Sequence, residues 1–295
     1  MRTLLLMTVG VLAVSLSGPL MAAMVVPPLA IAFWRNALAT TLLAPAALTT
    51  RRAEVVSLGP SQLRLVSLSG LALAVHFGTW VTSLTLTSVA SATAIVCLQM
   101  AWVVAWQMLH GERFPAGVVL GLVVSFAGVL VVSGVDFSLS LRALAGDLLA
   151  LVGGMASAAY MLVGSRARRT VSTTTYTFVC YGTCSAVLAI GSLVAGQDLV
   201  GYDVGQWLLL VGVTLTAQLL GHSVFNHLLA TTSPVLVSLA LLLEVPGASL
   251  IAALLLGQYP PSGAVAGLLV ILAGMTTVVL GNRPAPEPVR EPPLD

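Results

Sequence analysis

Long stretches without a charged side chain set the hydrophobic pattern of this chain. Residues 65–111, for example, contain no aspartate, glutamate, lysine or arginine. A helix that crosses about 30 Å of hydrocarbon needs about 20 apolar residues, so this stretch is long enough for two membrane spans. The apolar runs are continuous and do not alternate with polar positions, which favours transmembrane helices over a β-barrel.

Polar joins and prolines divide the chain into about ten predicted spans, since one span with its turn takes roughly 25 to 30 residues. Turns are expected at Pro27-Pro28, Gly59-Pro60, Pro115, Pro234 and Pro260-Pro261. The predicted fold class is therefore an all-α polytopic membrane protein with ten transmembrane helices. These spans are 4–24, 28–48, 65–86, 88–109, 115–134, 146–165, 173–195, 206–229, 234–256 and 261–281.

The composition agrees with this interpretation. Of 295 residues, 58% are hydrophobic and 7% are charged, against about 25% charged in a soluble domain. The mean hydropathy is +1.04. A net charge of +2 spread over the whole chain argues against a nucleic-acid partner and leaves the lipid bilayer as the expected surroundings.

The arginines predict the orientation in the membrane. All 12 basic side chains are arginine, and short cytoplasmic loops hold the excess of positive charge. With the N-terminus inside, ten arginines are cytoplasmic and only Arg142 is external. We therefore expect a multi-pass protein of the inner (plasma) membrane with both termini in the cytoplasm. Residues 282–295 contain five prolines and are predicted to form a disordered cytoplasmic tail.

An internal repeat appears when the sequence is shifted by 146 residues. Gly111, Pro115 and Gly121 then align with Gly257, Pro261 and Gly267, and several apolar positions between them also match. The chain is thus predicted to consist of two five-helix repeats, at 1–134 and 146–281. An odd number of spans in the first repeat inverts the second, and inverted repeats are typical of transporters with a site near the membrane midplane.

Short motifs at these positions resemble a known family. They are Phe33-Trp34-Arg35, His76-Phe77 with Trp80, Gly111-Glu112-Arg113, the run Gly221–Asn226, and Leu243-Glu244-Val245-Pro246. Together they resemble the drug/metabolite transporter superfamily of ten-helix EamA-type permeases. Gln258 stands where that family usually has glutamate, and Met100 where it commonly has proline. The resemblance implies a secondary transporter that moves a small metabolite or drug by alternating access, as an exporter.

Two histidines occupy equivalent positions of the two repeats. His222 follows His76 by 146 residues, and each lies near the predicted mid-depth, where a polar side chain is costly unless it faces protein or water. A structural hydrogen bond and a role in substrate binding or proton handling both stay open. We expect both histidines, with Gln99 and Asn226, to approach one central cavity between the repeats.

Other polar positions extend the candidate site. Thr214, Gln218, His222 and Asn226 recur every fourth residue, so they are predicted to share one helix face toward a cavity or a neighbouring helix. Glu244 is the one carboxylate deep within a predicted span, and it is expected to bind substrate or a coupling proton, or to serve as a structural donor.

Three further side chains have less certain roles. Arg35 and Tyr160 are interpreted as structural or uncertain, and Trp80 either lines a substrate cavity or packs against its neighbours.

The alternative function is an intramembrane metalloenzyme that uses His76, His222 and His227. The sequence lacks His-Glu-x-x-His and Gly-x-Ser-x-Gly patterns, so we expect no enzyme activity, no metal and no cofactor. It specifies neither the substrate nor the oligomeric state.

Overall fold

The computed structural model describes residues 2–232 and 234–281. The secondary structure within these ranges is helical, as the continuous apolar runs predict. The elements are α1 (Arg2–Ser15), α2 (Ser17–Ala22), α3 (Pro28–Leu48), α4 (Arg52–Val56), α5 (Pro60–Ser83), α6 (Val89–Val96), α7 (Gln99–Leu109), α8 (Ala116–Leu139), α9 (Leu141–Ala167), α10 (Thr173–Val194), α11 (Val204–Val213), the π-helix η1 (Thr214–His222), α12 (Ser223–Leu228), α13 (Pro234–Leu241), α14 (Glu244–Leu256) and α15 (Ser262–Gly281).

Each predicted span is occupied by one helix or by a run of consecutive helices. Among the described residues, six such segments are long and apolar enough to cross a membrane. Three shorter apolar helices lie at 116–131, 244–256 and 262–278. The number of ten spans stays a prediction, and the tail at 282–295 lies outside the described residues. The six segments are Thr3–Ala22, Pro60–Ser83, Val89–Leu109, Leu141–Ala167, Thr173–Val194 and Val204–Leu228.

Several spans expected to be continuous are interrupted. The first breaks at Leu16, and the segment 88–109 breaks between α6 and α7. The segment 234–256 breaks between α13 and α14 because the ring of Pro246 clashes with the carbonyl four residues earlier and Pro246 offers no N–H. At both later breaks the backbone makes shorter-range bonds, from Leu98 N to Ile95 O at 3.1 Å and from Leu243 N to Ala240 O at 3.2 Å.

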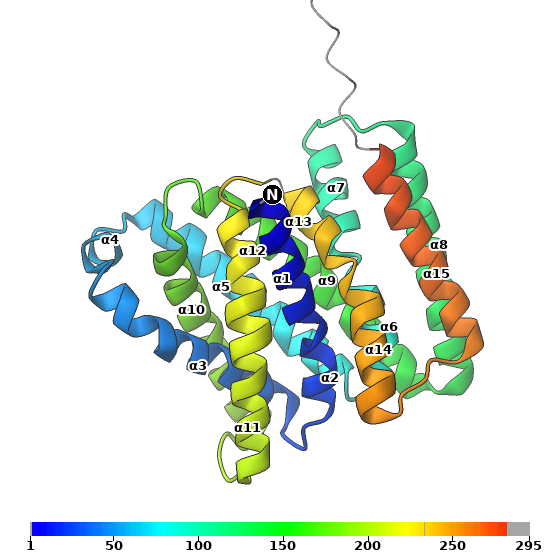
Figure 1. Ribbon diagram of the computed structural model, residues 1–295, viewed down its shortest axis with the longest axis horizontal. Coiled ribbons are helices and arrows are strands. Elements are labelled where there is room, and N and C mark those ends of the chain that lie inside the picture. Colours follow the sequence, from blue (N-terminus) through cyan, green and yellow to red (C-terminus); the bar gives the residue numbers. More distant parts are fainter. Residues whose placement is uncertain (1, 233, 282–295) are drawn as a thin grey trace, which may run out of the picture.

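Helices α8 and α15 pack side by side at one edge of the molecule (Figure 1). Glycines let their backbones approach closely. A Cβ on Gly274 would lie 2.5 Å from the backbone nitrogen of Ser125, and one on Gly121 would lie 2.5 Å from the Gly274 carbonyl oxygen. Small residues at such contacts are typical of helix pairs in membranes, where packing rather than hydrophobic burial drives association.

The remaining helices surround a buried interior in which α5 packs against both α9 and α10, and α3 packs against α10. Their connections fall at two ends of the molecule (Figure 1). The start of α1, the short helix α4 and the loop 168–172 lie at one end, which we call the α4 end. The loop 195–203, which precedes α11, lies at the opposite end, which we call the α11 end.

Candidate functional site

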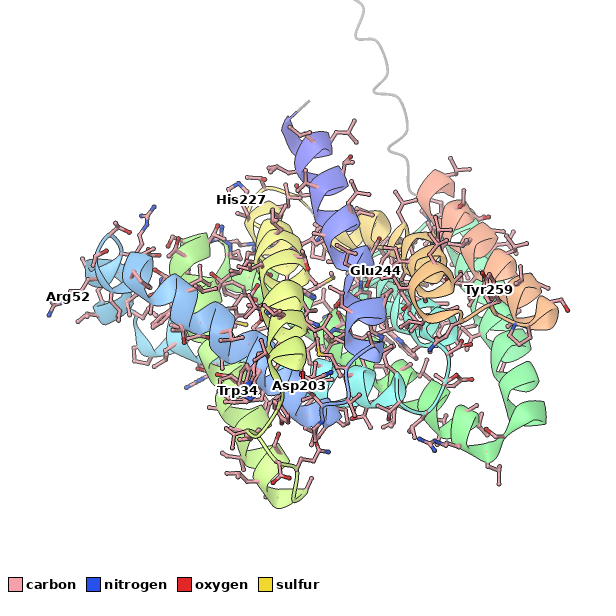
Figure 2. The ribbon with its side chains drawn as sticks, turned by 60° about the horizontal axis from the view of Figure 1, so that its bottom comes forward. Trp34, Arg52, Asp203, His227, Glu244 and Tyr259 are labelled. Carbon is pink, nitrogen blue, oxygen red and sulfur yellow. The ribbon has the colours of Figure 1, made fainter. Side chains whose placement is uncertain are left out.

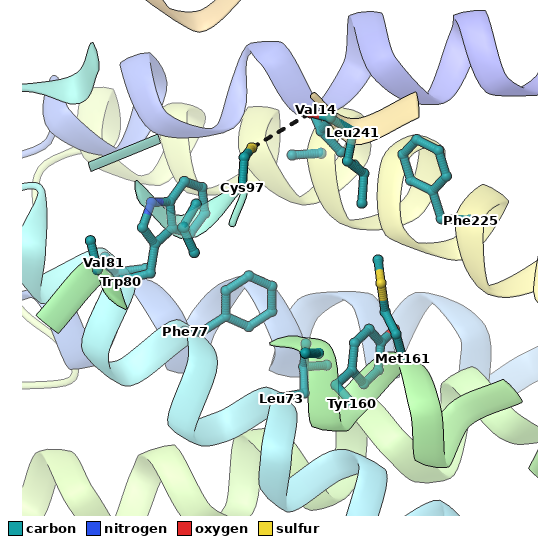
Figure 3. Packing of buried hydrophobic residues seen from close by; sticks show 14 of the residues in the cluster. Val14, Leu73, Phe77, Trp80, Val81, Cys97, Tyr160, Met161, Phe225 and Leu241 are labelled. Carbon is teal, nitrogen blue, oxygen red and sulfur yellow. Dashed lines mark hydrogen bonds between the residues drawn. The ribbon is translucent and has the colours of Figure 1, made fainter. Parts of the chain in front are cut away.

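A small cavity lies between helices drawn from both halves of the chain. Its volume is about 30 Å³, which is room for one or two water molecules. Figure 3 shows several of its side chains, including Trp80, Cys97, Tyr160 and Met161, converging from different helices around Phe77. The cavity is lined by His76, Trp80, Val96, Cys97, Gln99, Ser157, Tyr160, Met161, His222, Leu241 and Glu244.

The helix breaks bring two of these residues to the cavity. Gln99 is the first residue of α7, and Glu244 is the first residue of α14. Each of these residues therefore directly follows a helix break. The thiol of Cys97, at one break, donates to the carbonyl of Leu241, at the other, over 3.5 Å (Figure 3). Cys97 thus links the two breaks.

Aromatic rings form one wall of the cavity. His76 stacks on Trp80 with 5.6 Å between ring centroids and 15° between planes. His222 lies 6.4 Å from His76 and 6.4 Å from Tyr160, measured between ring centroids. Nδ1 of His76 is 3.0 Å from the Gly153 carbonyl oxygen. Because a carbonyl only accepts, Nδ1 is the donor in this contact.

Glu244, labelled in Figure 2, is buried, with only 7% of its surface exposed. Gln99 Oε1, across the cavity, accepts from Ser157. In the described part of the chain no hydrogen bond joins the Glu244 carboxylate to another group. An anion in such surroundings costs several kcal/mol unless a proton or a cation neutralises it. The side chain is therefore placed to take up one or the other.

Arg35 is fully buried beside the cavity and does not line it. Its Nε donates to Gln218 Oε1 at 2.8 Å, and one of its terminal nitrogens donates to Ser17 Oγ at 3.1 Å. The guanidinium also lies over the Phe77 ring, 4.1 Å from the ring centroid. Its charge is within electrostatic range of Glu244. Arg35 thus connects the first, third and eighth predicted spans, in keeping with a structural role.

The residues of the predicted polar stripe lie toward the protein interior: Thr214, Gln218 and Asn226 are buried, and His222 lines the cavity. Residues 214–222 form a π-helix instead of the expected α-helix. Gln218 bonds Arg35 and Asn36 and does not line the cavity. Asn226 does not line the cavity either, but its Oδ1 accepts from the Tyr160 hydroxyl at 2.5 Å.

The structure thus brings together six of the residues singled out from the sequence: His76, Trp80, Gln99, Tyr160, His222 and Glu244. Gln218 and Asn226 bond neighbours of this group instead. His227 lies away from the histidine pair, with its Nδ1 3.2 Å from Thr173 Oγ1 at the α4 end. The three histidines of the enzyme alternative are therefore not brought together.

Sequence reasoning did not single out Cys97, Ser157 or Met161 as cavity residues. The repeat offers a signal for one of them, because Cys97 and Leu243 are 146 residues apart and both lie at helix breaks. By the same shift Ser157 corresponds to Val11 and Met161 to Ser15. Neither pair keeps its polarity between the repeats, so the repeat does not mark these two positions.

Larger hollows lie elsewhere in the molecule. One of about 300 Å³ is lined mainly by apolar side chains of α7 and α9, one of about 600 Å³ by α1, α13, α14 and α15, and one of about 280 Å³ by residues 38–42 and 211–215. None of these three gathers titratable and amide side chains as the small cavity does, and such polar groups fix the orientation of a ligand. The small cavity is therefore the better candidate site.

Comparison with known proteins identifies the chain's relatives. It matches the EamA-like transporter family over residues 1–134 and 144–280. No curated protein matches it. A crystal structure of a protein has the same fold, with a TM-score of 0.69 and 18% identity over 96% of this chain and 99% of the other. The two family matches cover both repeats, and with its apolar helices the chain is a multi-pass membrane protein that belongs to the EamA-like transporter family.

Proposed function

We propose that this protein is a secondary transporter that exports a small metabolite or drug through the central cavity by alternating access. The observation that carries the proposal is the convergence of His76, Gln99, His222 and Glu244, two from each repeat, on one buried cavity. Polar side chains at this depth mark substrate or ion pathways in membrane proteins. The inverted repeats expected from the odd number of spans would supply the two exchangeable conformations.

Contacts at both ends support a cycle of this kind. At the α11 end, Trp34 Nε1 donates to the Leu199 carbonyl at 2.6 Å, and Leu29 N donates to Gln197 Oε1 at 3.0 Å. At the α4 end, Arg168 Nε donates to the Asn226 carbonyl at 2.9 Å. Alternating access would break one set at a time while the other stays closed.

Glu244 has the coupling role in this proposal. Its carboxylate has no hydrogen-bond partner in the described residues, and Arg35 is the buried cation within electrostatic range of it. In this proposal a proton and a cationic group of the substrate neutralise the carboxylate in turn. Exchange of the two would link proton entry to substrate exit. With both termini in the cytoplasm, as the arginine asymmetry predicts, the α4 end faces the cytoplasm and the α11 end faces outward.

A counterflow screen tests the proposal. Proteoliposomes that contain the purified protein are loaded with a mixture of metabolites and then diluted. The loss of each compound from the liposome interior is measured by mass spectrometry. We expect exchange of a limited set of small molecules in liposomes that contain the protein and none in empty liposomes. Absence of exchange for every compound, by protein that is monodisperse and folded, would contradict the transporter function.

A further inference from the structure

Asn226 connects the wall of the cavity with the α4 end of the molecule. Its side-chain Oδ1 accepts from Tyr160, which lines the cavity, and its Nδ2 donates to the Tyr181 hydroxyl at 3.2 Å. Its backbone carbonyl accepts from Nε of Arg168 at 2.9 Å. One buried residue thus holds a cavity side chain on one side and an arginine at the end of α9 on the other.

Arg168 lies here for a physical reason. Asn226 belongs to the last turn of α12, where carbonyls lack an intrahelical N–H partner and attract a positive charge. The other two guanidinium nitrogens of Arg168 donate to the Val171 carbonyl and, at 2.7 Å, to Thr173 Oγ1. Arg168 is only 7% exposed. Nε therefore ties Arg168 to the end of α12, while the other two nitrogens bond the loop 168–172 and the start of α10.

Glu54 holds the same loop from the first repeat. Its Oε1 accepts from the Ser172 backbone nitrogen at 2.6 Å, and its Oε2 accepts from Thr175 Oγ1 at 3.0 Å. These donors belong to the start of α10, where a carboxylate is favourable. The loop is thus fixed between α4 of the first repeat and α12 of the second.

We propose that Arg168 is a positioning residue that couples the cavity to the closure of the α4 end, through Asn226 and Tyr160. This proposal rests on the transport function proposed above. The cavity of about 30 Å³ must widen to hold a metabolite, and Tyr160 is in its wall. Movement of Tyr160 breaks its hydrogen bond to the Asn226 side chain. Asn226 is then free to move, and its backbone carbonyl is the acceptor for Arg168 Nε. A ligand shifts a conformational equilibrium only through contacts that differ between the two states, and the Tyr160–Asn226 bond is such a contact.

Cys97 provides a built-in reporter of opening because it lines the cavity. The other two cysteines, Cys180 and Cys184, are replaced by alanine in the background for this experiment. The rate at which Cys97 reacts with a membrane-impermeant maleimide is then measured from each face in sided vesicles. The face of the α4 end is identified separately through a cysteine placed at the exposed Ser57.

Two variants break the connection at different points, and a third is the control. Tyr160→Phe removes the hydroxyl but keeps the ring. Arg168→Lys keeps the charge but loses the planar guanidinium, whose three nitrogens reach three separate acceptors. Each is expected to speed Cys97 labelling from the α4 face about tenfold, as for loss of a hydrogen bond to a charged or buried group, with no change from the opposite face. The exposed neighbour Arg169 gives the control Arg169→Lys, which should leave both rates unchanged.

The double variant Tyr160→Phe/Arg168→Lys decides whether the two residues act as one unit. We expect it to label no faster than either single variant, because one broken link already uncouples the loop. Unchanged labelling in both single variants, equal increases from both faces, or effects that multiply in the double variant would overturn the proposal. Wild-type protein that exchanges no metabolite would instead contradict the transport function, and this is measured separately in proteoliposomes.

Discussion

The rings of His76 and His222, two residues 146 positions apart in the chain, lie 6.4 Å apart between centroids at the central cavity. Of these two rings, only that of His76 has a hydrogen bond among the described residues, from its Nδ1 to the Gly153 carbonyl. The pair thus combines one anchored ring with one that packs against Phe77 and Tyr160 without a polar partner. The two histidines occupy equivalent positions of the two repeats but make different contacts at the same site.

This difference predicts unequal effects of alanine. His76→Ala removes the buried hydrogen bond to the Gly153 carbonyl and should lower the stability of the detergent-solubilised protein by about 0.5 to 1.5 kcal/mol, the net contribution of one hydrogen bond. His222→Ala should reduce stability less while still impairing transport. Thermal unfolding of both variants, alongside transport, tests this. An equal loss of stability in both would contradict the assignment.

The orientation is tested by cysteine labelling. Ser57 and Asp198 are both exposed and lie at the α4 end and the α11 end, respectively. In intact cells, an impermeant maleimide should label a cysteine at Asp198 and leave one at Ser57 unlabelled, because the arginine-rich loops stay in the cytoplasm. Labelling of Ser57→Cys from outside the cell would reverse the orientation.

Close packing of α8 and α15 predicts sensitivity to one methyl group. In Gly274→Ala the new Cβ would lie 2.5 Å from Ser125 N, so stability should fall by about 1 to 3 kcal/mol, as for overpacking. Gly212 is the matched control, since a Cβ there meets no atom within 4 Å. Gly212→Ala should leave stability unchanged or raise it by up to about 1 kcal/mol. Equal melting temperatures of the two variants would refute this packing.

Glu54 predicts a dependence of stability on pH. Burial acts to raise the pKa of Glu54, but hydrogen bonds from Ser172 and Thr175 and the charge of Arg51 outweigh it, so its pKa is lowered overall. The ionised carboxylate therefore stabilises the fold above its unfolded pKa of about 4.3, and this contribution is lost as the pH falls through the folded pKa.

Thermal unfolding of Glu54→Gln measures this contribution. The melting temperature of the wild type should exceed that of the variant at pH 7, and the gap should shrink toward pH 3. The exposed Glu112 supplies the control Glu112→Gln, for which we expect no such gap. A difference between wild type and Glu54→Gln that is the same at every pH would show that the charge of Glu54 is not the cause.

The sequence predicts the helical segments well because charge-free stretches and prolines are read directly from it. It also predicts that His76 and His222 meet, since the repeat makes them equivalent. The break beside Gln99 and the π-helix at 214–222 are not visible in apolar periodicity, because they depend on which carbonyl each backbone N–H bonds. The break beside Glu244 does have a signal in the sequence, which is Pro246. The position of Tyr160 at the cavity could not be predicted from the repeat, because the residue 146 positions earlier is the apolar Val14.

The most direct test of the account is transport by Glu244→Gln protein in proteoliposomes over a range of pH, with a substrate found in the counterflow screen and Glu112→Gln as the matched control. Glutamine keeps the shape of the side chain but takes up no proton and no charge. We expect Glu244→Gln to stay folded, to transport more slowly and to lose the pH dependence, while Glu112→Gln behaves as wild type. Glu244→Gln protein with the wild-type rate and pH profile would contradict the central role of this cavity carboxylate.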